Sequence, residues 1–192
     1  MNLEEILGNA LDGNTISRMS QTLGTDQTTT TNAIQVALPM LLGGLAKNSS
    51  TPDGATSLLG ALDRDHDGSV LDDVGGFVAN YGSGDGGGIL AHVFGNRTGA
   101  IEQGVSQTTG LNSGTTAQLL MMLAPIVMGA LGRAKQQGSL DQSNLPAALS
   151  GATQQMGGNS GTFGMLSQLL DSNKDGSAVD DVLRMASGFF GK

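Results

Sequence analysis

The chain has 192 residues and no cysteine, which excludes disulfides, thiol catalysis and cysteine-ligated metals. Its formal net charge is −8, and its nine Lys and Arg residues form no cluster that could neutralise nucleic-acid phosphates or dock on an anionic membrane. Aromatic residues make up 3% of the chain and hydrophobic residues 38%, so the core is expected to be aliphatic.

Two short helices are predicted at the start of the chain. Apolar residues recur with a helical period over residues 3–11, and Gly13 ends this pattern. A second helix is expected over residues 16–23. Glu4 and Glu5 stand where a secretory signal would carry Lys or Arg, so a cytoplasmic location is expected.

Two longer segments are apolar nearly all round, residues 33–46 and 119–131. Such a helix is either buried in a protein core or spans a membrane. Each run covers about 13–14 residues, which is short of the ~18–20 that a bilayer requires. We therefore predict two central buried helices, and expect the threonine run at residues 28–31 to cap the first of them.

Shorter helices are predicted around two acidic stretches. Residues 55–62 lead into the first stretch and residues 70–80 leave it, while residues 164–170 and 178–190 flank the second. The sequence GSGDGGG at residues 82–88 is typical of a flexible linker.

The two halves of the chain resemble each other at a shift of 86 residues. This shift places residues 19–24 on residues 105–110, and Pro39 on Pro125. The acidic stretches are 108 residues apart, so about 22 additional residues belong to the second half, around residues 136–155. Such self-similarity indicates an internal repeat.

No segment alternates β-branched and polar residues as a strand would, so the predicted fold is all-α. We expect a single domain over residues 1–192, built of two diverged helical repeats at about 1–88 and 89–192. Its apolar central helices are expected to pack together, and each repeat carries one Asp-rich, EF-hand-like loop.

The acidic stretches read DRDHDGS at residues 63–69 and DSNKDGS at residues 171–177. Calcium takes about six to eight oxygen ligands, and an EF-hand loop supplies them from positions 1, 3, 5, 7 and 12 around a glycine at position 6. Gly68 and Gly176 fall at that turning position. The spacing therefore predicts two calcium sites.

The end of each loop departs from the EF-hand pattern, because position 12 is valine instead of glutamate. A deletion of one residue explains this departure and makes Asp73 and Asp181 the closing acids, with Asp72 and Asp180 as open alternatives. The predicted oxygen ligands are Asp63, Asp65, Asp67, Ser69 and Asp73 in the first loop, and Asp171, Asn173, Asp175, Ser177 and Asp181 in the second.

Two alternatives to calcium stay open. Magnesium comes second, because it prefers fewer protein ligands and a stricter geometry. The loops could also be capped turns without metal, since Ser69 is followed three residues later by Asp72, as in a capping box.

No catalytic constellation is found, and we expect the protein not to be an enzyme. His66 occupies a loop position that normally faces solvent, and His92 is expected to pack or cap a short helix. The many Ser and Thr residues lack a nucleophile motif.

Three features together resemble a known family. They are the segment GGILAHVFG at residues 87–95, the proline-containing apolar helices with Gly43 and Gly129, and the acidic loops. They are similar to bacterial domain of unknown function family 937, which includes YidB-like proteins, over nearly the whole chain. The resemblance implies a bacterial helical protein of uncharacterised function and supplies no catalytic residues.

The sequence thus favours a non-enzymatic calcium-binding module in which two ions stabilise helix–loop–helix corners. The alternatives are a metal-free structural or protein-interaction module and, less favoured, a membrane-active helical protein. Nucleic acid is not expected as a partner and a membrane is disfavoured. The protein partner is unidentified, and a homo-oligomer stays open.

Overall fold

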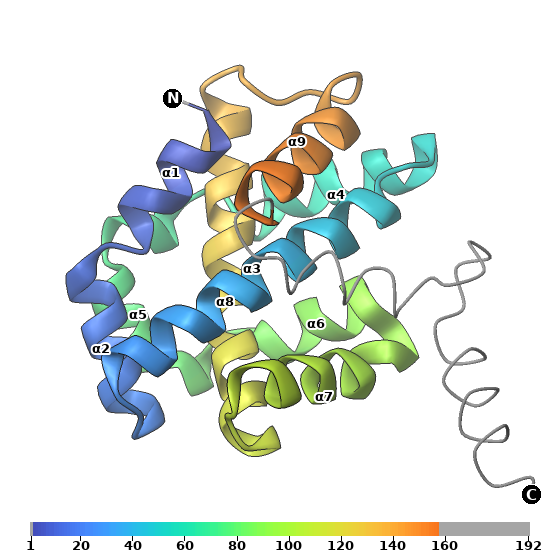
Figure 1. The fold of residues 1–192 in the computed structure, drawn as a ribbon. Coiled ribbons are helices and arrows are strands. Elements are labelled where there is room, and N and C mark those ends of the chain that lie inside the picture. Colours follow the sequence, from blue (N-terminus) through green and yellow to red (C-terminus); the bar gives the residue numbers. More distant parts are fainter. Residues whose placement is uncertain (1, 158–192) are drawn as a thin grey trace, which may run out of the picture.

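The computed structural model describes residues 2–157, and these residues form helices and no strand. Figure 1 shows α3 and α8 crossing at the centre of the other helices. The all-α prediction is confirmed for this part of the chain. The α-helices are α1 Leu3–Ala10, α2 Gly13–Leu23, α3 Gln27–Asn48, α4 Pro52–Arg64, α5 Val74–Ala79, α6 Gly86–Phe94, α7 Thr98–Thr109, α8 Ser113–Gln136 and α9 Leu145–Gly157, with 3₁₀ turns at Ser69–Asp72, Tyr81–Ser83 and Gly95–Arg97.

The core is built around α8, whose residues are buried on every side of the helix through its middle. Leu119, Leu123 and Ile126 have no exposed surface, and α3 adds Leu41 and Leu42 to the same core. Truncating such a leucine to alanine typically destabilises a protein by about 2–5 kcal/mol. The prediction that both apolar segments are buried central helices is confirmed.

Both central helices are longer than their apolar runs, because more polar residues continue each helix at both ends, and neither Pro39 nor Pro125 ends its helix. α8 reaches 24 residues, so by length and composition it could cross a membrane. For α8, the argument that its apolar run is too short to span a bilayer was therefore wrong. Burial supports the same conclusion instead, since 78% of its most apolar window lies inside the protein.

The start of α3 is capped by Asp26 and not by the predicted threonines. The Asp26 carboxylate accepts a hydrogen bond from the backbone N–H of Thr29, at 2.9 Å. The Thr30 hydroxyl instead donates to the backbone carbonyl of Asp26, at 3.0 Å. Asp is a strong cap because its short side chain reaches the free N–H groups of the first turn.

The predicted linker at residues 82–88 is wrong at its C-terminal end, because α6 begins at Gly86. Gly86 is buried against the backbone of Met121, and a side chain there would overlap the Met121 carbonyl. Pro125, four residues after Met121, has no N–H to bond that carbonyl. The absence of a side chain at Gly86 therefore lets α6 approach α8 closely.

The segment after the first acidic stretch also differs from its prediction. In place of one helix over residues 70–80, a 3₁₀ turn, Ser69–Asp72, is followed by α5. Asp73 separates the two with an extended φ of −145°.

The additional residues of the second half contain α9, which packs along α3.

Candidate functional site

The first acidic stretch, residues 63–73, lies on the C-terminal turns of α8, and is called the acidic loop below. Gly68 turns the chain with a φ of 94°, so the predicted turning glycine is confirmed. The side chains of Val70 and Leu71 then rest over Gly129 of α8. The loop is thus seated by apolar contact as well as by polar groups.

The closest approach between loop and helix is at Gly132. A side chain at this position would overlap the backbone carbonyl of His66. Gly132 is itself buried. Glycine at this position therefore sets how closely the loop backbone can pack on α8.

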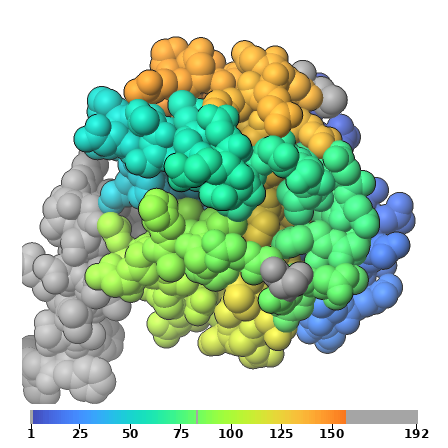
Figure 2. Space-filling model, turned by 180° about the vertical axis from the view of Figure 1, so that it is seen from behind, coloured from blue at the N-terminus to red at the C-terminus, as the bar shows by residue number. Residues whose placement is uncertain are grey.

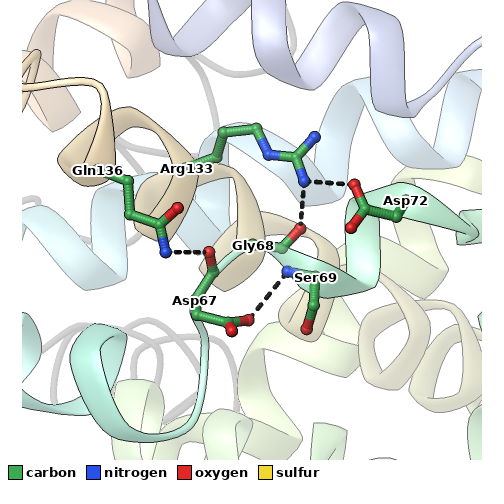
Figure 3. Close-up of polar contacts among 6 residues, drawn as sticks. All are labelled: Asp67, Gly68, Ser69, Asp72, Arg133 and Gln136. Carbon is green, nitrogen blue, oxygen red and sulfur yellow. Dashed lines mark hydrogen bonds and ion pairs between the residues drawn. The ribbon is translucent and has the colours of Figure 1, made fainter.

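Arg133 joins the loop to α8 by two hydrogen bonds (Figure 3). One terminal nitrogen of its guanidinium donates to the carbonyl of Gly68 at 2.9 Å and to the carboxylate of Asp72 at 2.6 Å. Charge-assisted bonds of this kind are about twice as strong as neutral ones. Arg133 therefore binds both the backbone of the turn and a carboxylate beyond it.

Two further side chains at the end of α8 hold the loop. The Lys135 ammonium donates to the Asp63 carboxylate and to the carbonyl of Leu59, the latter at 3.3 Å. The Gln136 amide donates to the carbonyl of Asp67 at 2.7 Å (Figure 3). Arg133, Lys135 and Gln136, called the α8 end below, therefore contact the loop at successive points.

The remaining loop acids serve the backbone or face solvent. Asp67 accepts from the backbone N–H of Ser69 at 3.0 Å, and Asp73 caps α5 by accepting from Gly76 at 2.8 Å. Asp65 is exposed and lies 4.0 Å from the side chain of its neighbour Arg64. The five predicted ligands of this loop therefore do not converge on one point.

The metal prediction can be compared with this arrangement. No three His, Asp or Glu side chains within residues 2–157 come together as a group that could hold a metal ion. Lys135 also stands beside Asp63, at the position predicted to begin the calcium site. In this conformation the loop does not present the ligands that calcium requires. Calcium binding itself stays a prediction.

The capping box predicted from Ser69 and Asp72 does not form. Gly68 precedes the 3₁₀ turn, with no side-chain bond capping it, and Asp72 pairs with Arg133. The second acidic stretch lies outside the described residues. So do the predicted helices at residues 164–170 and 178–190.

Two titrating groups of the loop are shifted by these contacts. The hydrogen bonds from Ser69 lower the pKa of Asp67, and the positive charge of Arg133 lowers it further. Burial lowers the pKa of His66 against the opposing effect of Asp65 and Asp85. His66 is half-buried, so the expectation that it faces solvent was wrong.

Both histidines of the chain line one cleft beside the loop, between α4 and α6. His92 is exposed at its mouth, and its backbone carbonyl accepts from the side chain of Asn48 at 3.2 Å. Neither this cleft nor the α8 end was identified from the sequence. Basic residues are common in the last turn of a helix, because they interact favourably with the negative end of the helix dipole. The basic residues at the end of α8 therefore did not indicate a site in the sequence.

Comparison with known proteins gives one family. The model described as "Bacterial protein of unknown function (DUF937)" matches residues 5–136. The match ends at the last residue of α8 and is shorter than the resemblance over nearly the whole chain that the sequence suggested. No curated protein and no solved structure matches the chain.

Proposed function

This chain belongs to the DUF937 family of bacterial proteins of unknown function, and we propose that it is a non-enzymatic helical module whose acidic loop is held without metal. The α8 end takes the role that a calcium ion would have in an EF-hand. Its cations neutralise loop acids and set where the loop leaves for α5. The module would serve as a rigid scaffold for protein interaction.

The observation that carries this proposal is the set of bonds from Arg133 and Lys135 to the loop. Each cation binds one carboxylate and one backbone carbonyl, so each satisfies a charge and fixes a main-chain position. A calcium ion at Asp63 would have to displace Lys135. Like charges in close proximity repel, which opposes that exchange.

Thermal unfolding of the full-length, metal-stripped protein tests the proposal. We expect the same Tm in 10 mM CaCl2 and in EDTA, with ionic strength matched by NaCl. An ion present at 100 times its Kd would add about 2.7 kcal/mol, or roughly 5–10 °C for a domain of this size. A rise of that size that disappears in the variant Asp67→Ala would overturn the metal-free loop.

The second acidic stretch supports a second candidate function, calcium binding at residues 171–181. Its Asp171, Asn173, Asp175, Ser177 and Asp181 keep the ligand spacing, and they lie outside the described residues. Calcium titration calorimetry separates the cases. One site that Asp175→Ala removes supports calcium there alone, two sites support both loops, and no binding rejects calcium in both.

The internal repeat belongs to the same proposal. It is supported by the starts of the central helices, where Asn112 caps α8 by accepting from Thr115 at 2.9 Å, as Asp26 caps α3 through Thr29. The 86-residue shift also places α1 on α6 and α2 on α7. An experimental structure of the whole chain tests it, and halves that fail to superimpose would reject it.

The other expectations from the sequence are part of this proposal. We infer no nucleic-acid partner, because nine Lys and Arg residues are scattered over a chain of net charge −8. We also infer a cytoplasmic protein that does not insert into membranes. Full recovery in the supernatant after sedimentation with anionic liposomes is expected, and recovery in the pellet would contradict it.

A further inference from the structure

We propose that the cleft between α4 and α6 binds a small organic cation, a protonated amine carried on an apolar body. Figure 2 looks onto the face where α4, in cyan, lies beside α6, in yellow-green. The inference goes beyond the scaffold role proposed above and does not rest on it. It combines the size of two adjoining hollows with the charges of the side chains that line them.

The cleft has the size and the lining of a ligand site. Its volume is about 850 Å³, within the range of roughly 300–1,000 Å³ that is usual for such sites. α4 contributes Leu58 and Ala61, which are only half-buried. The buried floor residues are Leu45, Ile89, Val93 and Met128. An apolar ligand body in the cleft would therefore be removed from water and would cover the exposed part of these side chains.

A smaller crevice adjoins the cleft on the side of the acidic loop. Its volume is about 360 Å³. Asp65, His66 and Asp85 line both the cleft and the crevice, so the two hollows meet at these residues. The apolar residues of the crevice are Val70, Phe77 and Pro125. A ligand with two parts of different chemistry can therefore occupy both hollows at once.

The crevice is acidic. Asp65, Asp67 and Asp85 line it, and none of its lining residues in the described part of the chain is Lys or Arg. Burial lowers the pKa of His66 against the opposing effect of Asp65 and Asp85, so both carboxylates lie near its ring. The net charge of −8 on the whole chain acts in the same direction. The crevice therefore favours a positive group over a negative one.

The three carboxylates of the crevice differ in their present partners. Asp67 accepts a hydrogen bond from the backbone N–H of Ser69. Asp65 lies 4.0 Å from the guanidinium of Arg64. Asp85 is exposed and makes no capping hydrogen bond to α6, the helix that it precedes. Asp85 is therefore the carboxylate best able to accept hydrogen bonds from an ammonium group.

Two further side chains indicate how the ligand would be oriented. Arg64 lines the cleft and not the crevice, and it is paired with Asp65. Phe77 lines the crevice and not the cleft, and the face of an aromatic ring attracts a cation. These positions place the ammonium group in the crevice beside Asp85 and the apolar body in the cleft.

Three probes with the same apolar body test the binding. They are 4-phenylbutylamine, 4-phenyl-1-butanol and 4-phenylbutyrate, which are a cation, a neutral molecule and an anion at pH 7.5. Each is titrated into the full chain in EDTA, and the ring-proton NMR signals of His66 and His92 are followed. We expect the amine to bind with a Kd on the order of 1 mM, as is usual for a ligand of about eleven non-hydrogen atoms.

The order of the three affinities decides the chemistry of the site. We expect the amine to bind at least fivefold more tightly than the alcohol, and the carboxylate to bind most weakly. Equal affinities for the amine and the alcohol, or tighter binding of the carboxylate, would overturn the assignment to a cation. Histidine signals that do not move with the amine would reject the binding site itself.

Two variants test the two parts of the site. Asp85→Asn keeps the shape of the side chain, and we expect it to weaken the amine at least fivefold and to leave the alcohol unchanged. Asp53→Asn is the matched control, because Asp53 is exposed on α4 and lines neither hollow. Equal losses in these two variants would show an effect of net charge alone and would overturn the role of Asp85.

Ala61→Phe tests the cleft by filling it from α4. We expect this variant to lose the binding of both the amine and the alcohol, because the apolar body has no other place to lie. Circular dichroism and the Tm check that the variant keeps its fold. Unchanged affinity for the amine in a folded variant would reject the cleft as the site of the apolar body.

Discussion

The C-terminal halves of α8 and α3 both use glycine for close packing, but the neighbours of Gly132 in α8 differ in kind from those of Gly43 and Gly44 in α3. In α8, a side chain at Gly132 would overlap a backbone carbonyl of the acidic loop. In α3, a side chain at Gly44 would meet the side chains of Phe94 and Val93, at 2.7 Å, and one at Gly43 would meet only Thr153, at 3.9 Å.

Glycine therefore has two different uses in these two similar helices. A backbone held by several hydrogen bonds cannot move aside, whereas the end of a side chain can rotate into another rotamer. The α8 end therefore depends on its glycine for the position of the loop. The packing of α3 depends less on its glycines, because the side chains next to them can move. The following predictions test this contrast, from the largest expected effect to the smallest.

The largest effect is expected for Gly132→Ala. The new methyl group would push the loop backbone off α8, and overpacking of this kind costs about 3 kcal/mol or more where the neighbour cannot adjust. For a domain of this size that corresponds to a Tm lower by roughly 6–12 °C. A calorimetric Tm within 2 °C of the native value would contradict a rigid loop at this position.

A smaller loss is expected for Arg133→Met, which keeps the length of the side chain and removes its hydrogen bonds. The cost is about 1–2 kcal/mol, at the low end for charged bonds, because the Asp72 side chain is 70% exposed. Lys47→Met near the end of α3 is the matched control, since Lys47 is exposed. Urea unfolding should separate the two variants, and equal losses would contradict the role of Arg133.

Gly43→Ala on α3 should have the opposite sign. Its new methyl group would make ordinary contact with Thr153, and alanine favours a helix over glycine by about 0.5–1 kcal/mol. We therefore expect a slightly higher Tm. A clear loss of stability would show that α9 packs on α3 as tightly as the loop packs on α8.

The smallest effect is expected from pH, through Asp67. Because the pKa of this carboxyl is lowered in the folded protein from its ordinary value of 3.8, its contribution is present above that value and is lost as pH falls through the folded pKa. Asp67→Asn removes this contribution, so the variant should be slightly less stable than the native chain at pH 7, and the two stability curves should converge as pH falls below about 4. A loss of stability of the same size at pH 7 and at low pH would contradict this assignment.

His66 provides a check at a higher pH. Burial lowers its pKa from the ordinary value of 6.5, so the unfolded chain takes up a proton first as the solution is acidified. Stability is therefore full above pH 6.5 and falls as pH drops through the folded pKa. This window lies above that of Asp67, so the two groups can be measured in one titration.

Much of the fold could be predicted because it depends on local patterns. The apolar runs, the short N-terminal helices and the turn at Gly68 all follow from spacing along the chain. The wrong predictions concern residues whose local structure depends on contacts with residues distant in sequence. Gly86 was assigned to a linker because its packing against Met121 of α8 cannot be inferred from its neighbours in sequence.

The candidate site shows the same limit more strongly. The acids of residues 63–73 were identified as a candidate site, but the side chains of α8 that contact them were not. Arg133 and Lys135 are 61 and 72 residues away in sequence from the carboxylates that they bind. Nothing in the spacing of the acids distinguishes an ion from a lysine, because both neutralise a carboxylate.

The sequence by itself determined that residues 2–157 are helical, that the two apolar segments are buried, and that the acidic loop turns at Gly68. Periodicity and glycine conformation are properties of a few adjacent residues, so the sequence contains them directly. Only the tertiary structure decided what the acids contact. That choice depends on which helix end packs beside the loop, and on Gly132, which lets the loop backbone approach α8 closely enough for Arg133 and Lys135 to bind it.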